Sequence, residues 1–208
     1  MGGIRVILTG DWTIEAGLRD QWAIWQSDCD ALLPEMFRDL TTVQQAQVRA
    51  ALGPTQPPVP IHLVAPLTSP PTIPSIWIGG GGGGEQADGD VIGQAWGEDA
   101  ATGAPIFGVW IQQSWRITAY GVDLLSTLAM ATLIRWALYR QRLTWGQEPP
   151  AFVRQTVQWQ DWEPVPDGLL QDGVFPFTRP TIFTVTHADT WTTAPPPVIT
   201  AVDPVTLS

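Results

Sequence analysis

The hydrophobic pattern of the chain opens with a helical stripe. Apolar positions that repeat at steps of three or four residues are Ile14, Leu18, Trp22, Trp25, Cys29 and Leu32. This spacing places side chains on one face of an α-helix. We expect Asp11 or Thr13 to cap its start and Pro34 to limit its end, because a proline has no N–H to donate within a helix. A shorter helix is expected near residues 42–51.

The strongest helical pattern lies at residues 122–145. Its apolar face is formed by Leu124, Leu125, Leu128, Ala131, Ile134, Leu138 and Tyr139. The uncharged stretch 124–134 before Arg135 is much shorter than the ~20 residues that cross a bilayer. Arg140 and Arg142 lie near the end, where positive charge is favourable beside the negative pole of the helix dipole. We therefore expect a core helix of a soluble domain.

Alternation of apolar and polar residues predicts β-strands elsewhere. In the segment 103–121, one face is formed by Phe107, Val109, Ile111, Gln113, Trp115 and Ile117. Other strands are predicted at residues 75–78, 90–96, 151–162, 173–177 and 181–191. Half-buried strands of this kind are typical of antiparallel sheets. The expected fold class is α+β, an antiparallel sheet packed by two main helices.

The domain organisation follows from proline and glycine. Residues 1–192 are expected to form a single domain that contains a Pro-rich insert at 53–75 and a Gly-rich loop at 79–90. Prolines deny hydrogen bonds to a sheet, so the insert is predicted to be an extended, edge-type segment. Residues 193–208 are predicted to form an extended arm that docks on its own body or on a neighbour.

The unbroken glycine run Gly79–Gly84 raises the question of a phosphate-binding loop. Such a loop opens directly into a helix, whose N–H groups converge on the anion. Here an acidic, strand-like segment follows, and Glu85, Asp88 and Asp90 would repel a phosphate. We interpret the run as slack between two strands, because glycines carry no side chain to pack and lose much entropy on ordering.

Residues 88–99 partly match a calcium loop. Asp88, Asp90 and Gly93 occupy its first, third and sixth positions, but apolar Ile92 stands at the fifth and the shorter Asp99 at the twelfth. We interpret this segment as a solvated acidic turn and predict no metal site.

Candidates for catalysis are few. The sequence contains no Gly-x-Ser-x-Gly elbow, and His62 and His187 are the two histidines that could act as a base. Both are interpreted as structural or surface histidines. Cys29 is the single cysteine, which excludes an internal disulfide. We therefore expect no enzyme activity, no catalytic residue and no cofactor.

Composition narrows the possible partners. A net charge of −10 argues against a protein that grips nucleic acid, and is compatible with a surface past which DNA slides. Charged residues make up 14% of the chain, below the about 25% of ordinary domains. Either partners cover part of the surface, or Gln, Thr and Pro supply its polarity. The N-terminus does not match a signal peptide, so synthesis in the cytoplasm is expected.

Tryptophan is abundant, with 12 residues. Trp159 and Trp162, together with Trp110 and Trp115, could form a platform that stacks on sugar rings. Aromatic residues are also enriched at permanent subunit interfaces. A carbohydrate-binding module of a phage tail or secreted protein is therefore kept as an alternative function.

The order of elements over residues 10–192 resembles that of the tail-terminator and neck proteins of tailed bacteriophages. The likeness rests on the first amphipathic helix, on "SIWIGGGGGG", on "RITAYGVDLLSTLAMATLIRWAL", and on the closing strands "VQWQDWEPVPDG" and "GVFPFTRPTIFTVTHADTW". The Pro-rich insert and the C-terminal arm depart from a compact member.

The resemblance implies a non-enzymatic, structural subunit of the virion. It would form a homo-oligomeric, hexameric ring that joins the tail tube to the head connector, with DNA passing through the lumen without specific binding. Its expected partners are copies of itself and the tail-tube and neck proteins, and no membrane is involved.

Overall fold

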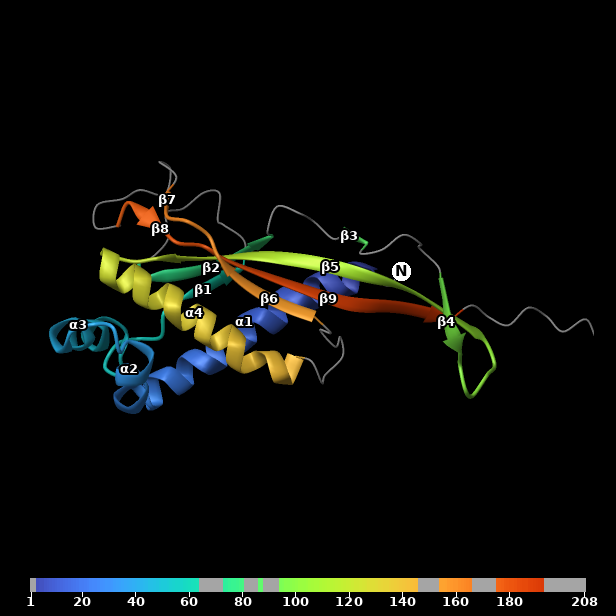
Figure 1. The fold of residues 1–208 in the computed structure, drawn as a ribbon, viewed down its shortest axis with the longest axis horizontal. Coiled ribbons are helices and arrows are strands. Elements are labelled where there is room, and N and C mark those ends of the chain that lie inside the picture. The colour runs from blue at the N-terminus through green and yellow to red at the C-terminus, as the bar shows by residue number, and fades with distance from the viewer. Residues whose placement is uncertain are drawn as a thin grey trace, which may run out of the picture.

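A layer of helices covers one face of a twisted, mostly antiparallel sheet (Figure 1). The structure, a computed structural model, describes residues 3–63, 73–80, 86–87, 94–145, 154–165 and 175–192. The described helices are α1 (Gly3–Ser27), α2 (Cys29–Met36), α3 (Thr42–Leu52) and α4 (Leu124–Trp145). The mixed α+β class is confirmed. In the part of the chain that is described, no helix has the length and hydropathy of a membrane span.

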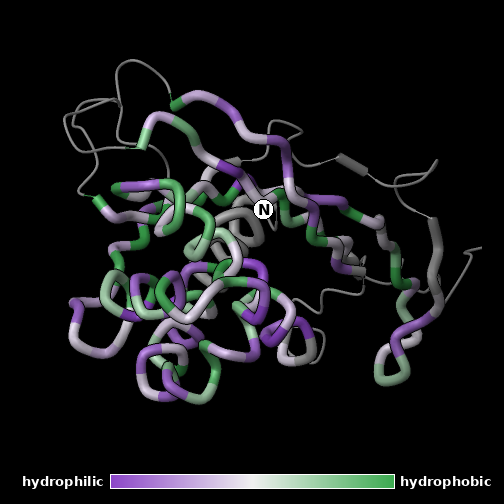
Figure 2. Tube along the Cα trace, turned by 60° about the vertical axis from the view of Figure 1, so that its left-hand side comes forward, coloured by the Kyte–Doolittle hydropathy of each residue, from purple (hydrophilic) through white to green (hydrophobic). Residues whose placement is uncertain are grey.

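The first helix begins earlier than predicted. α1 starts at Gly3 and continues past Asp11 and Thr13, so neither residue is its N-cap. The predicted apolar stripe is confirmed, since its members are buried or, for Leu32, partly buried against the same core. In Figure 2, hydrophobic and hydrophilic positions alternate along the helices, as expected for elements with one buried side.

The predicted first helix is also divided in two. The backbone leaves the helix at Asp28, and α2 then contains Pro34 and ends at Met36. Pro34 was expected to limit the helix, but a proline removes only its own donor, so the turn is completed before the helix stops. α3 is confirmed, and it starts with a capping box in which Thr41 and Gln44 each bond the other's backbone N–H.

One large sheet has the strand order β1-β2-β5-β9-β6, and β3 and β4 also pair with β5. Its strands are β1 (Ile61–Leu63), β2 (Ser75–Gly80), β3 (Gln86–Ala87), β4 (Gln94–Glu98), β5 (Pro105–Tyr120), β6 (Arg154–Trp159) and β9 (Thr181–Thr192). The β1–β2 pair is parallel and the other pairs are antiparallel. The strands predicted at 75–78 and 181–191 are confirmed, and those predicted at 90–96, 151–162 and 173–177 are confirmed in part. β1 lies within the predicted Pro-rich insert, but residues 64–72 of the insert and the predicted C-terminal arm at 193–208 lie outside the described residues.

The helix-facing side of the sheet carries the main core. The predicted face of β5 is confirmed over residues 111–117, where Ile111, Gln113, Trp115 and Ile117 are all buried. α4 packs against this face and against α1 and α3, and its buried residues include Met130, Leu133, Ile134 and Leu138. The predicted apolar face of α4 is wrong at two positions, because Leu124 and Tyr139 are 52% and 44% exposed. The buried side of α4 is centred on Met130 and Ile134, so these two lie at its margin.

Two short strands, β7 (Glu163–Pro164) and β8 (Phe177–Thr178), cover part of the opposite face. Val165 packs there with Trp77 and Tyr120, and burial raises the pKa of the Tyr120 hydroxyl. The Thr178 hydroxyl donates to the Ala119 carbonyl at 2.7 Å. This bond anchors the β7–β8 pair to the end of β5.

The passage from β5 into α4 requires a glycine. A Cβ on Gly121 would lie 2.4 Å from the Thr127 hydroxyl oxygen and 2.8 Å from the Thr127 backbone nitrogen. The first turn of α4 therefore approaches the strand end closely. Asp123 caps this turn, because its Oδ1 accepts from the Ser126 N–H at 2.6 Å.

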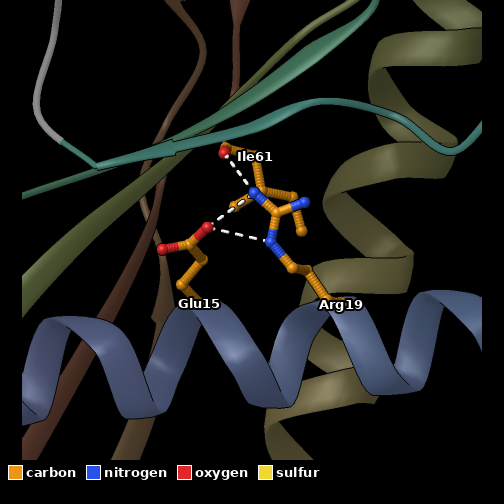
Figure 3. A network of polar contacts seen from close by, with 3 residues as sticks. All are labelled: Glu15, Arg19 and Ile61. Carbon is orange, nitrogen blue, oxygen red and sulfur yellow. Dashed lines mark hydrogen bonds and ion pairs between the residues drawn. The ribbon is translucent and has the colours of Figure 1, made fainter.

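The edge strand β1 is tied to α1 by an arginine. Arg19 donates to Glu15, one turn earlier on α1, and its Nη2 also donates to the Ile61 carbonyl at 3.0 Å (Figure 3). The guanidinium thus satisfies a backbone acceptor on a strand that has one sheet neighbour among the described strands.

Candidate functional site

β4, β5 and β9 extend well beyond the helices (Figure 1). We define the β-ribbon as residues 94–110 and 187–192. β5 and β9 pair continuously from Ile117↔Thr181 to Ile106↔Thr192, whereas β6 pairs with β9 only as far as Thr186. Within the described residues, the outer backbone edge of β9 beyond Thr186 therefore has no strand beside it. An unpaired edge presents N–H and C=O groups that can bond another chain.

The side chains of the β-ribbon are rich in apolar groups. Ile106 and Phe107 are partly buried, and Trp110 is 40% exposed. The sequence pattern placed Phe107 on the predicted face of β5, but it did not predict that the strand extends past the helical layer. A projecting ribbon with apolar side chains is a candidate protein-interaction surface.

The tip of the β-ribbon is a turn organised by Asp99. Its Oδ1 accepts from the backbone N–H of Ala101 and Thr102 and from the Thr102 hydroxyl, at 3.0, 2.8 and 2.9 Å. These donors, led by the hydroxyl, hold the pKa of the Asp99 carboxyl below its usual value. Asp99 is the last position of the possible calcium loop, and in the structure its Oδ1 accepts hydrogen bonds within the turn. The other loop positions, Asp88, Asp90 and Gly93, lie outside the described residues.

The glycine run is only partly a loop. Gly79 and Gly80 belong to β2, where they pair with Arg116 and Trp115, and residues 86–87 form β3 beside β5. The prediction of a loop over 79–90 is therefore wrong at these positions, because the long β5 strand offers backbone partners there. The remaining glycines and Glu85 lie outside the described residues.

The two histidines are not brought together with a nucleophile in the described part of the chain. His62 lies in β1, and its ring meets Trp77 edge to face with centroids 5.7 Å apart. His187 lies in β9 opposite Ile111. Cys29 is buried, and this burial raises the pKa of its thiol. Among the described residues, no three His, Cys, Asp or Glu side chains are placed to hold a metal ion.

The four candidate tryptophans do not form one platform. Trp115 is 2% exposed and stacks on Phe183 in the core, while Trp110 projects from the other face of β5. Trp162 contacts Phe175 beside the β7–β8 pair. The Trp159 ring lies beneath the guanidinium groups of Arg135 and Arg179, whose Cζ atoms are 4.5 and 4.3 Å from its centroid. The prediction of a four-tryptophan sugar platform is therefore wrong.

This arginine–tryptophan contact was not predicted from the sequence. Its members come from α4, β6 and the segment between β8 and β9, so no local spacing could reveal it. Arg135 also lies over the Tyr139 ring, with 5.4 Å from its Cζ to the ring centroid. Comparison of the chain with protein-family models and with curated protein sequences finds no match.

Proposed function

We propose that the protein is a non-enzymatic structural subunit that assembles into a ring, and that this ring is a tail terminator or neck component of a tailed bacteriophage. In this role it joins the tail tube to the head connector and lets DNA pass through its centre. The observation that carries the proposal is the β-ribbon, with its apolar side chains and with a β9 edge that no described strand pairs beyond Thr186.

A projecting ribbon suits a ring because each subunit must present two different surfaces to its two neighbours. The β-ribbon offers one such surface, and the helical layer at the other end of the molecule offers another. Backbone bonds along a strand edge give affinity, and apolar side chains beside it give specificity. The order of elements, which resembles that of phage terminator and neck proteins, supports the same proposal.

The acidity of the chain supports the DNA-channel part of the proposal. A net charge of −10 gives no electrostatic hold on phosphates, so DNA could pass along such a surface without sticking. By contrast, no observation favours the carbohydrate-binding alternative, because Trp115 is in the core and a sugar would have to displace a guanidinium to stack on Trp159.

The assembly can be tested by sedimentation velocity and native mass spectrometry over a wide concentration range. We expect a closed oligomer of one size, seen as rings by electron microscopy. Trp110→Ala should weaken assembly, whereas Trp162→Ala, which removes a similarly exposed tryptophan outside the β-ribbon, should not. A protein that stays monomeric at every concentration would contradict the ring. Purified phage particles that lack the chain by mass spectrometry would contradict its place in the virion.

A further inference from the structure

The arginines with described side chains divide into two groups. Arg19, Arg38, Arg49 and Arg116 each form an ion pair with a carboxylate. Among the arginines whose side chains are described, those that form no ion pair are Arg135, Arg140, Arg142 and Arg179, which we call the arginine cluster. Four cations without carboxylate partners are unexpected in a chain with 20 acidic residues and 10 basic ones.

Two members of the cluster, Arg135 and Arg179, meet where α4 packs against β6, and the other two lie near the end of α4. Arg135 and Arg179 share the Trp159 ring, and Arg140 lies over Trp136 with 5.2 Å from its Cζ to the ring centroid. The Arg142 carbonyl accepts from Gln155 Nε2 of β6 at 2.9 Å, which holds the end of α4 against this strand. The cluster is thus built on packed elements rather than on a loop alone.

Stacking prepares these guanidinium groups to bind an oxyanion. A guanidinium held over an aromatic ring still has N–H donors for a second partner, in the fork that matches a carboxylate. The ring also restricts the side chain, so less conformational entropy is lost when a partner binds. The chemistry of the cluster therefore favours carboxylates or other oxyanions.

Carboxylates that could supply this partner lie on and beside α2. Asp28, Glu35 and Asp39 are exposed, and we call them the α2 carboxylates. The Asp39 side chain is 95% exposed and its contact with Arg38 is long, at 3.9 Å. In Figure 1, α2 lies at one end of the helical layer and the C-terminal end of α4 lies well away from it, beneath β6. One molecule therefore cannot join these two surfaces itself.

We infer that the arginine cluster binds the α2 carboxylates of a second copy of this chain. The contact joins two different surfaces, so it repeats head to tail and is the kind that generates a ring. The inference rests on the proposed ring function and names the charged part of the contact between neighbours. Charge complementarity favours an acidic protein surface as the partner of the arginine cluster. A nucleic acid is a less favourable partner, because the net charge of the chain is −10.

A charge-swap experiment tests this inference on the full chain. One variant carries Arg135→Glu and Arg179→Glu, and the other carries Asp28→Arg, Glu35→Arg and Asp39→Arg. Alone, each variant should lose at least about tenfold in self-association affinity by sedimentation velocity, because like charges then face each other. Mixed in equal amounts, they should assemble again, since every contact in an alternating ring joins opposite charges.

Two further variants separate charge from folding. Arg142→Glu changes the charge of the cluster without removing a side chain that lies over an aromatic ring. It should weaken assembly while lowering the thermal unfolding temperature only slightly, since a negative charge is unfavourable at the C-terminal end of α4. Arg38→Gln, which removes an 82% exposed arginine beside the α2 carboxylates, should not weaken assembly. Raising the salt concentration should weaken the wild-type contact.

The outcomes are distinguishable. A wild-type protein that never assembles would remove the ring proposal and this inference with it. A wild-type ring that the folded cluster variants reproduce unchanged would overturn the inference and leave the ring proposal standing. Folded variants that do not assemble when mixed would also overturn it. So would cluster variants that lose binding to a DNA oligonucleotide while their assembly is unaffected.

Discussion

The strand β5 passes through two environments that differ in what covers it. Over residues 111–119 its alternate side chains lie in the core, and Trp115, Ile117 and Ala119 are at most 2% exposed. Over residues 106–110 the same strand keeps its pairing with β9 as it runs toward the end that projects past the helical layer in Figure 1, and Trp110 is 40% exposed. The body half thus owes its stability to burial, whereas the β-ribbon is held mainly by its backbone ladder.

This difference shows how one sheet can serve two purposes. The hydrogen bonds between β5 and β9 continue from the packed residues 111–119 into the β-ribbon. They hold the β-ribbon in place although it buries little apolar surface on its own. Such a region has a low free energy of local opening in the isolated subunit, because few apolar contacts hold it closed. A neighbour that covers the β-ribbon would supply the missing burial.

The largest expected effect is on the stability of the packed core beneath the sheet, and it is tested at Trp25 of α1. Trp25 is 0% exposed, its Nε1 donates to the Leu52 carbonyl at 2.9 Å, and its ring meets Phe37 edge to face. Trp25→Ala should lower the free energy of unfolding by about 3–5 kcal/mol, because it leaves a cavity and an unpaired carbonyl. Urea unfolding measures this loss.

Trp162→Ala is the matched control for this prediction. Trp162 is 38% exposed, so its truncation should cost less than about 1 kcal/mol. Equal losses for the two variants would contradict the view that burial in the body decides the stability.

A smaller effect is expected at Gly103, in the tip of the β-ribbon. Gly103 has φ = 67°, which an L side chain adopts at a cost of roughly 1 kcal/mol. Gly103→Ala should therefore speed hydrogen exchange of the β4 and β5 amides near the turn by about fivefold, with core amides unchanged. Gly79→Ala is the control, because a Cβ there meets no atom within 4 Å. A uniform effect on all amides would show that the β-ribbon does not open separately.

Much of the fold was predictable because periodicity reports which side of an element is buried. The face of β5, the position of α4 and the presence of α3 all follow from local patterns. The break at Asp28 was missed because α1 and α2 bury their stripes in the same core, so the apolar spacing continues across it. Periodicity does not identify which element or partner buries an apolar face. The β-ribbon was missed for that reason.

The candidate surfaces were less predictable, because their residues come from distant parts of the chain. The contact of Trp159 with Arg135 and Arg179 joins three elements and has no sequence signature. One error was avoidable, however. Trp110 and Trp115 stand an odd number of positions apart in one strand, so the pleat alone places them on opposite faces.

The smallest expected effect concerns the protonation of Asp99, and it tests whether the β-ribbon responds separately from the body. The hydrogen bonds from Thr102 and Ala101 lower the pKa of this carboxyl in the folded state. Their stabilising contribution is therefore complete above the unfolded-state pKa, near ~3.9, and is lost as the pH falls through the lower folded-state pKa. In NMR spectra the Ala101 and Thr102 amide signals should shift with a midpoint below the ordinary ~3.9, while the Trp25 indole signal stays unchanged. In Asp99→Asn this pH dependence should disappear, because the amide does not titrate. If both amides instead shift at the ordinary pKa of an aspartate, the turn does not hold the carboxylate and the tip of the β-ribbon is organised in some other way.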